Sequence, residues 1–245
     1  MGLPSAFIDT KVKLGDRGIV QLADFGKDTQ QHFKVARLKN EQLLTILNGQ
    51  GESWLLEKQE QQFFVRSHRN HEKLSPEIHL FLSPPAGDAL SQTVQQSTEV
   101  GVASFHFFRS EFCQWKKSKD LNLERLQRVA SAACAQCSQP WLPSFDPTPL
   151  QSLEQALSHS EGPCFIADED THKEALLYKE QLKTLRAKTK NSGRLNLFVG
   201  PEGGWSPGEH KLIDQKCEKI SLGPLVLRVP TACVAGLTLL RQMSQ

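Results

Sequence analysis

"LNLFVGPEGGWSPGEH", residues 195–210, leads from an apolar segment through a turn rich in glycine and proline into a polar segment. The apolar residues 195–200 predict a buried strand. Ser206 suits a helix N-cap, with Pro207 at the first helical position and Glu209 completing a capping box. The stretch therefore predicts a strand–turn–helix unit, the building block of an α/β fold.

The same letters contain a second pattern, because residues 204–208 read G-x-S-x-G, the serine nucleophile motif of α/β hydrolases. That motif uses the backbone N–H of the residue after the serine in its oxyanion hole. Pro207 has no N–H. After Ser206 the acid should precede the histidine, yet His210 precedes Asp214. The sequence therefore favours a capping role for Ser206 over a catalytic one.

Strand and helix patterns alternate from Glu77 to the C-terminus. Strands are predicted at 78–83, 104–108, 164–168, 195–200 and 219–223, and helices at 88–102, 121–138, near 171–187, from 207 onward and at 230–243. Apolar strands alternating with helices predict a parallel sheet covered on both faces. A ligand of such a sheet belongs at the carboxyl ends of its strands.

The N-terminal third of the chain has a different pattern. Short β segments are predicted at 18–22, 43–49, 53–58 and 63–68, and Asn48-Gly49 predicts a hairpin turn. The spacing indicates a small barrel or sandwich. We therefore expect two domains, 1–75 and 76–245.

Two turns follow strands of the predicted parallel sheet, "GPEGG" at 200–204 and "LGPLVLRVPTA" at 222–232. The first lacks the G-x-G-x-x-G of dinucleotide sites and the second lacks the lysine of a P-loop, so a phosphate cradle is not supported. The glycines at 200, 203, 204 and 223 allow close backbone approach and positive φ. Two interpretations remain open, a backbone-lined site for a flat heterocycle such as adenine and a pair of tight connections without a ligand.

These two turns also carry a family resemblance. "LFVGPEGGWSPGE" together with "ISLGPLVLRVPTACVAGLTLL" resembles the paired C-terminal motifs of the RsmE-like family, SPOUT-superfamily methyltransferases of uridine N3 in small-subunit (16S) ribosomal RNA. "HFKVARLKNEQLLTILNGQGE" at 32–52 is similar to the family's PUA-like barrel, and "VQQSTEVGV" at 94–102 to its "QKATELGV" helix. The resemblance implies an α/β fold, a SPOUT-type trefoil-knotted parallel sheet domain with an N-terminal PUA-like β-barrel that binds RNA.

The resemblance further implies S-adenosyl-L-methionine bound in the knot, small-subunit ribosomal RNA as the partner, and a homodimer. It assigns Arg228 as the catalytic candidate, orienting the cofactor loop or a phosphate, and Arg37 and Gln136 as substrate-binding candidates. The residues that it implies for cofactor binding are Phe198, Val199, Gly200, Pro201, Glu202, Gly203, Gly204, Ile220, Ser221, Leu222, Gly223, Leu227, Arg228, Thr231 and Ala232.

Departures from the family pattern affect the expected chemistry. The family's L-R-T-E-T-A reads "LRVPTA" at 227–232, so Pro230 replaces a carboxylate. Its "AAEQSGR" segment reads "ACAQCSQ" at 133–139, which loses the acid and the arginine. A methyltransferase is the leading interpretation. The alternatives are a non-catalytic homologue that binds RNA or cofactor, and a methyltransferase with another RNA target.

Composition sets the remaining bounds. The 245 residues carry a net charge of +2, so nucleic-acid binding must rest on local patches such as the basic runs at 109–120 and 179–194. Runs of this kind are more often solvated helix faces than binding sites. Six scattered cysteines indicate reduced thiols in a cytoplasm. Cys134 and Cys137 form a C-x-x-C without a second ligand pair, which favours packed helix residues over a metal or redox site. We expect no metal and no membrane span.

Overall fold

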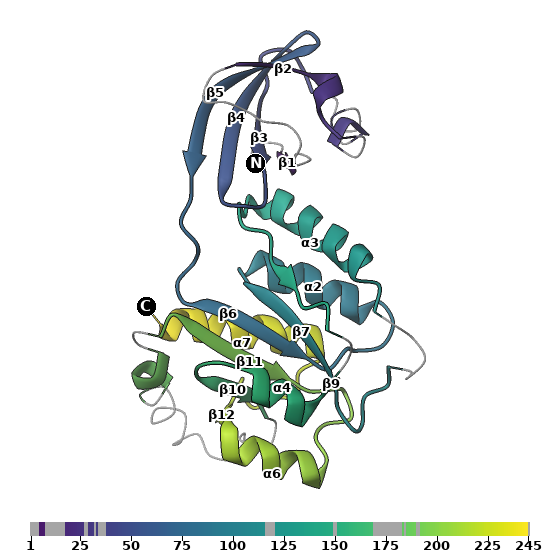
Figure 1. Cartoon of the computed structure of the whole chain (residues 1–245), viewed down its shortest axis with the longest axis vertical. Coiled ribbons are helices and arrows are strands. Elements are labelled where there is room, and N and C mark those ends of the chain that lie inside the picture. The colour runs from purple at the N-terminus through teal and green to yellow at the C-terminus, as the bar shows by residue number, and fades with distance from the viewer. Residues whose placement is uncertain are drawn as a thin grey trace. The chain divides into compact units, whose positions relative to one another are not determined.

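The computed structural model describes residues 5–7, 18–26, 29–31, 33, 38–115, 121–148, 151–168, 183, 185–189 and 192–244 (Figure 1). The chain forms two compact units. The N-terminal unit comprises Met1–Lys73 and Ala130–Leu142, and the C-terminal unit comprises Leu74–Val129 and Pro143–Gln245. The domain division into 1–75 and 76–245 stays a prediction, and in these units residues 130–142 group with the N-terminal strands.

A five-stranded sheet forms the N-terminal unit, in the order β1 (Ser5–Phe7), β3 (Leu43–Leu47), β4 (Glu52–Gln59), β5 (Gln62–Asn70) and β2 (Ile19–Gln21). β1 pairs with β3 in parallel and the other pairs are antiparallel. A short 3₁₀ helix, η1 (Leu22–Asp24), follows β2. The hairpin predicted at Asn48-Gly49 joins β3 to β4, and Gly49 has the positive φ of +72° that favours glycine.

The core of this sheet is aromatic. Phe25, Phe33 and Phe63 are buried and their ring centroids lie 5.3 to 5.4 Å apart. Phe25 meets the other two rings edge to face, and such contacts add to the hydrophobic gain of burying the rings. Leu44, Ile46 and Leu56 extend the same cluster along the two central strands.

The C-terminal unit contains the predicted parallel sheet. Its order is β12 (Glu218–Ile220), β10 (Cys164–Ala167), β11 (Arg194–Val199), β6 (Glu77–Leu82), β7 (Ser104–Arg109) and β8 (Ser144–Phe145), and β9 (Gln151–Ser152) also pairs with β7. Every pair in it is parallel. The predicted α/β fold class is confirmed, and all five strands predicted for this sheet are present.

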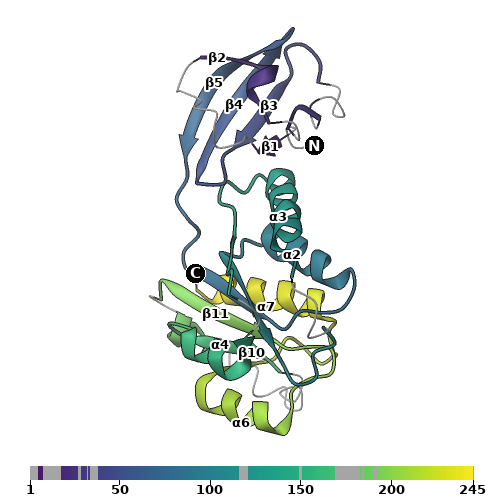
Figure 2. The same ribbon diagram turned by 45° about the vertical axis from the view of Figure 1, so that its right-hand side comes forward.

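Helices cover both faces of this sheet (Figure 2). α7 (Val229–Met243) packs on β6, β11 and α2 (Ala89–Glu99), and the other face carries α4 (Leu153–His159) and α6 (Pro207–Lys216). Alternation along β11 explains the division. Leu197 faces α7 at Gly236, while Phe198 joins the cluster under α4 and α6.

Two of the helices predicted from the sequence remain to be compared with the structure. The one expected at 121–138 is present as α3 (Leu123–Cys137). The helix expected near 171–187 falls mostly outside the described residues. At its C-terminal end, residues 183 and 185–189 are described and are helical. Among the described helices, none combines the length and apolar character that crossing a membrane requires.

Candidate active site

A cavity of about 270 Å³ lies in the C-terminal unit, at the carboxyl ends of β10, β11 and β12. Its volume is close to the lower end of the range of about 300–1,000 Å³ typical of ligand sites. The position agrees with the rule that α/β sheets bind ligands at the carboxyl edge. The lining residues are Ala167, Asp168, Val199, Gly200, Pro201, Glu202, Gly204, Trp205, Ile220, Leu222, Leu225, Val226, Leu227, Arg228, Val229 and Ala232.

One wall of the cavity is the turn after β11, residues 200–205. A Cβ on Gly200 would lie 2.7 Å from the Trp205 ring, and a Cβ on Gly203 would lie 2.9 Å from Cβ of Phe112. Trp205 in turn stacks on Phe108, with ring centroids 6.0 Å apart and planes 6° apart. This wall is therefore held in place by contacts within the protein, and Gly200 and Gly203 are required for space.

Ser206 begins the helix that follows this turn, as predicted. Its hydroxyl accepts a hydrogen bond from the Glu209 backbone N–H at 3.3 Å, and the Glu209 carboxylate accepts one from the Ser206 N–H at 2.9 Å. The second Glu209 oxygen accepts from the Glu111 N–H at 3.1 Å, which ties α6 to the loop after β7. The hydroxyl of Ser206 is buried and engaged in capping, so the predicted N-cap role is confirmed.

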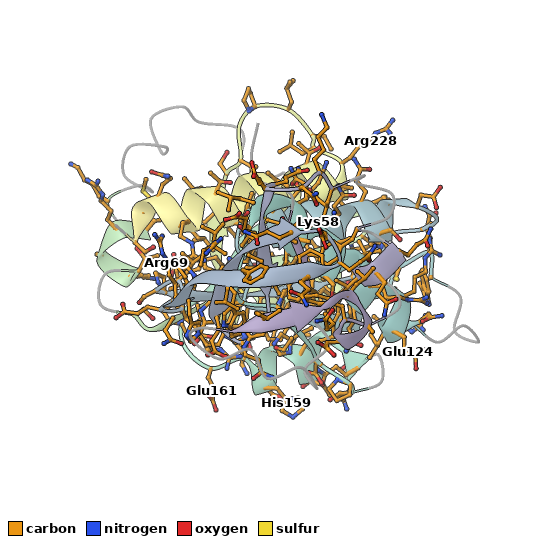
Figure 3. The ribbon with its side chains drawn as sticks, turned by 90° about the horizontal axis from the view of Figure 1, so that it is seen from above. Lys58, Arg69, Glu124, His159, Glu161 and Arg228 are labelled. Carbon is orange, nitrogen blue, oxygen red and sulfur yellow. The ribbon has the colours of Figure 1, made fainter. Side chains whose placement is uncertain are left out.

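The opposite wall is the segment between β12 and α7, residues 221–228. Gly223 has φ +119°, a conformation that L side chains rarely adopt. Leu225 and Val226 are 71% and 76% exposed although they are apolar. Arg228, the N-cap residue of α7, projects outward from the ribbon (Figure 3). Pro230 is buried in the first helical turn, which contains no acidic residue.

A buried carboxylate, Asp168, completes the lining directly after β10. Its side chain is 2% exposed, and its Oδ2 lies 3.1 Å from Nζ of Lys219 and 4.0 Å from Nδ1 of His210. Lys219 also contacts Asp214 at 2.8 Å. Hydrogen bonds to Asp214 and then to Asp168 raise the pKa of Lys219, and the Lys219 ammonium lowers the pKa of Asp214. Lys219 therefore stays charged between two carboxylates.

The cavity contains ten of the residues implied for the cofactor. Arg228 is among them, and the rest are Val199, Gly200, Pro201, Glu202, Gly204, Ile220, Leu222, Leu227 and Ala232.

The other five implied residues are not in the cavity lining. Phe198 points into the core on the far side of β11 from Leu197. Gly203 packs on Phe112, and Thr231 is exposed on α7. Ser221 and Gly223 lie in the second wall, where the Ser221 hydroxyl accepts from the Gly223 N–H at 3.4 Å.

The two substrate-binding candidates lie elsewhere. Gln136 is an exposed residue of α3 in the N-terminal unit. Arg37 lies outside the described residues, as do Lys116, Lys117 and Lys119 of the first basic run and Lys179 and Lys190 of the second. Their roles stay predictions.

Sequence reasoning missed several lining residues. Trp205, Leu225 and Val226 lie inside the two motifs but were not singled out there. Ala167 and Asp168 end a predicted parallel strand, so the carboxyl-edge rule was the available signal.

A Ser–His–Asp arrangement occurs at a different place in the sheet. The Ser104 hydroxyl lies 2.8 Å from Nε2 of His106, whose Nδ1 lies 3.0 Å from Asp146 Oδ2. Ser104 is 3% exposed and also lies 2.5 Å from Nδ1 of His79. Burial lowers the pKa of His106. Because the hydroxyl is buried and shared by two imidazoles, the cluster satisfies buried polar groups and offers no accessible nucleophile.

The C-x-x-C pair lies on α3, as predicted. Cys134 is buried, and burial raises the pKa of its thiol to about 12. Cys137 is exposed, and neither cysteine forms a disulfide bond. A thiol that stays protonated is a poor nucleophile and metal ligand, which supports the packing interpretation.

The parallel sheet has a cavity at its carboxyl edge, between two glycine-containing loops. This arrangement is typical of α/β proteins that bind a ligand there. The family model described as RNA methyltransferase domain matches residues 72–241. The chain belongs to this RNA methyltransferase family.

Known relatives agree with this assignment. Ribosomal RNA small subunit methyltransferase E of Buchnera aphidicola is 26% identical over 233 residues, which cover 89% of this chain and 87% of the relative. The protein of the same name from Synechocystis is 29% identical over 222 residues, covering 85% of this chain and 69% of the relative.

Solved structures show the same fold. A ribosomal RNA small subunit methyltransferase E from Neisseria gonorrhoeae, bound to S-adenosyl methionine, has a TM-score of 0.78 at 22% identity over 99% of this chain and 98% of its own. A methyltransferase from Legionella pneumophila in complex with the same cofactor has a TM-score of 0.76 at 23% identity over 100% and 99%. The fold is therefore the SPOUT fold of RsmE-like proteins, with a PUA-like N-terminal domain.

Proposed function

We propose that this chain is an S-adenosyl-L-methionine-dependent methyltransferase that acts on N3 of a uridine in small-subunit ribosomal RNA. The observation that carries the proposal is the cavity between residues 200–205 and 221–228 in a member of the RNA methyltransferase family. Relatives named ribosomal RNA small subunit methyltransferase E and a neighbour bound to S-adenosyl methionine support it.

The cavity suits a nucleoside-type cofactor. Gly200 brings backbone to the surface of the cavity because it has no Cβ to meet Trp205, and Ile220, Leu222 and Leu227 supply apolar surface. Backbone N–H and C=O groups recognise the edge of a heterocycle, and apolar side chains cover its faces. When bound, the cofactor supplies a methyl group on a positively charged sulfur.

Positioning supplies much of the rate in such a transfer. Trp205, braced by Phe108, keeps the first wall in place. Arg228 stands exposed at the edge of the cavity, where its guanidinium is suited to a phosphate of the RNA. The N3 proton must be accepted during the reaction, and Glu202, an exposed carboxylate on the first wall, is the candidate for a hydrogen bond to the base.

The proposal includes the finer properties implied by the resemblance. The protein acts as a homodimer in the cytoplasm, binds ribosomal RNA through its N-terminal unit, and uses Arg37 and Gln136 to hold the substrate. The oligomeric state is measured by sedimentation of the purified chain with and without cofactor.

Methyl transfer to unmodified small ribosomal subunits tests the main proposal. Labelled S-adenosyl-L-methionine is supplied, and the product nucleotide is located by mass spectrometry of nuclease fragments. We expect one methyl group on one uridine. A folded sample that binds the cofactor and transfers nothing to small subunits would overturn the proposal.

The loss of charge at Pro230 favours a second candidate, a homologue that binds RNA and cofactor without catalysis or that methylates another RNA. Pro230 is buried at the start of α7, so a carboxylate is absent from that turn. Total cellular RNA from a strain lacking the protein distinguishes the two forms of this candidate. Methyl transfer to a species other than small-subunit RNA indicates retargeting, and transfer to none indicates a binding protein.

A further inference from the structure

Two cysteines lie side by side at the amino ends of neighbouring strands. Cys164 begins β10, and Cys217 directly precedes β12. The two strands pair in parallel with Phe165 opposite Glu218, so the cysteines stand one residue before this pair. The backbone of Cys217 is already extended, and both cysteines pack against the hydrophobic cluster under α4 and α6. The fold therefore places two thiols on one face of the sheet, although they are far apart in the sequence.

The spacing of these two positions suits a disulfide bond. Neighbouring strands of a sheet lie about 4.7–4.9 Å apart, and a disulfide bond requires Cα atoms roughly 4.4–6.8 Å apart. Neither cysteine forms a disulfide bond in this structure. A bond between Cys164 and Cys217 can therefore form with β10 and β12 in their present register.

The Cys164 sulfur lies among hydrogen-bonding groups. The Ser160 hydroxyl lies 3.1 Å from it, and Nδ2 of Asn196 donates to it at 3.8 Å. Asn196 is fully buried, and its Nδ2 also donates to the carbonyl oxygen of Glu161 at 2.7 Å. The amide is therefore held in place beside the sulfur, where it stabilises a negative charge.

The environment of the pair makes the two thiols unequal. A hydrogen bond from the Cys217 thiol is the main cause that lowers the pKa of Cys164; burial opposes it, and Ser160 and Asn196 add to the lowering. The same hydrogen bond and burial raise the pKa of Cys217. Lys216 lowers both pKa values, whereas Glu218 raises that of Cys217. Cys164 is therefore the thiolate of the pair, and the thiolate is the reactive form of cysteine.

Access also distinguishes this pair from the other cysteines. Cys164 and Cys217 are only half-buried, so a small oxidant can reach them. Cys134 of the C-x-x-C pair and Cys233 of α7 are buried, and burial raises the pKa of both thiols. The reactive pair is therefore assembled by the sheet and is not the C-x-x-C of the sequence.

We propose that Cys164 and Cys217 form a site of oxidative modification, which reacts with a peroxide and closes to a disulfide bond. The Cys164 thiolate attacks one oxygen of hydrogen peroxide, the O–O bond breaks, and a sulfenic acid and a hydroxide ion form. The hydroxide takes the proton of the Cys217 thiol and becomes water. The Cys217 sulfur then attacks the Cys164 sulfur, the S–O bond breaks, and hydroxide leaves. The two sulfurs together lose two electrons, which reduce the peroxide.

The bond would tie an edge strand to its neighbour. β12 is the outermost strand of the sheet and leads into residues 221–228, the second wall of the cavity. The thiols lie at the amino ends of the strands, whereas the cavity lies at the carboxyl ends. The inference is therefore independent of the proposed function.

Treatment of the reduced full chain with hydrogen peroxide tests the inference. Remaining thiols are alkylated, and peptides are mapped by mass spectrometry without reduction. We expect one main disulfide bond, between Cys164 and Cys217. In Cys217→Ser the sulfenic acid should persist and label Cys164 with dimedone, whereas Cys164→Ser should leave Cys217 unlabelled. The control Cys137→Ser removes the exposed thiol of α3 and should form the same bond at the wild-type rate.

Alkylation of the wild-type chain needs no variant. Between pH 8 and pH 6 the reaction of iodoacetamide with an ordinary thiol slows by roughly 80-fold, because its pKa is about 8.5. At Cys164 we expect the rate to fall by less than about tenfold, since a lowered pKa keeps the thiolate at lower pH. A fall at Cys164 as steep as that of glutathione in the same solution would overturn the inference. A peroxide product without a bond between Cys164 and Cys217 would do so as well, and neither result bears on methyl transfer.

Discussion

The two walls of the cavity use glycine for different reasons. In residues 200–205 the glycines at 200 and 203 are fixed by neighbours, since a Cβ would meet Trp205 or Phe112. In residues 221–228, Gly223 is fixed by its φ of +119°, and no heavy atom of the described residues lies within 4 Å of the position of its missing Cβ. The first wall is a packed part of the protein, and the second presents exposed Leu225 and Val226. The first wall is therefore the rigid one, and the second is the one that is accessible to solvent.

Gly200→Ala should have the largest effect, because it breaks the packing of the first wall. The added methyl group would lie 2.7 Å from a ring that is stacked on Phe108. Overpacking of this kind typically costs about 1–3 kcal/mol, so the free energy of unfolding from urea titration should fall by that amount. Displacement of Trp205 should also weaken cofactor binding.

Gly208→Ala is the matched control for this change. The nearest atom to a Cβ at Gly208 is the Ser206 hydroxyl at 3.8 Å, an ordinary contact, and the residue lies in α6. We expect the variant to be unchanged or stabilised by up to about 1 kcal/mol. Equal behaviour of the two variants would show that the first wall is not tightly packed.

Gly223→Ala tests the second wall, where conformation rather than space is limiting. Holding alanine at φ +119° should cost about 1–2 kcal/mol of unfolding free energy. Gly193→Ala is the control, because the described residues leave that Cβ position open and no positive φ is recorded there. The control should stay within about 0.5 kcal/mol of the wild type. A Gly223→Ala protein as stable as the control would mean that this loop relaxes freely.

Ser206→Ala should cost about 1 kcal/mol, the usual value of an N-cap, because the orphan N–H of Glu209 loses its acceptor. Methyl transfer should persist at the saturating cofactor concentration. Ser152→Ala removes the equivalent cap of α4 and gives the comparison in unfolding free energy. If Ser206→Ala lost all activity but kept its stability, while Ser152→Ala stayed active, the hypothesis of a catalytic serine would have to be reconsidered.

Local patterns predicted those parts of the molecule that local chemistry determines. The cap at Ser206, the hairpin at Asn48-Gly49 and the buried strand leading to Val199 all follow from neighbouring residues. The two-residue strands β8 and β9 were not predicted, because so short a run has no period and forms only where β7 offers an edge. The parallel pairing of β1 with β3 likewise depends on residues 40 positions apart.

The site shows the same limit. Each wall is one continuous stretch of sequence, and both stretches were predicted as binding turns, including Gly200 and Arg228. Asp168 joins them only because β10 lies between β11 and β12, and its partner Lys219 comes from a different strand. The residues next to Asp168 in the sequence therefore do not predict its contact with Lys219.

The smallest effect on stability is expected at the exposed end of the second wall. Leu225→Ser with Val226→Ser removes side chains that are 71% and 76% exposed, so the unfolding free energy of the chain should change by less than about 0.5 kcal/mol. Exposed apolar side chains beside a cavity mark a contact surface. Under the proposed homodimer, the double variant should therefore shift sedimentation toward the monomer and weaken cofactor binding while the chain stays folded. A loss above about 1 kcal/mol in a sample that sediments as a monomer would instead place these side chains in the packing of the chain, and the contrast between the two walls would disappear.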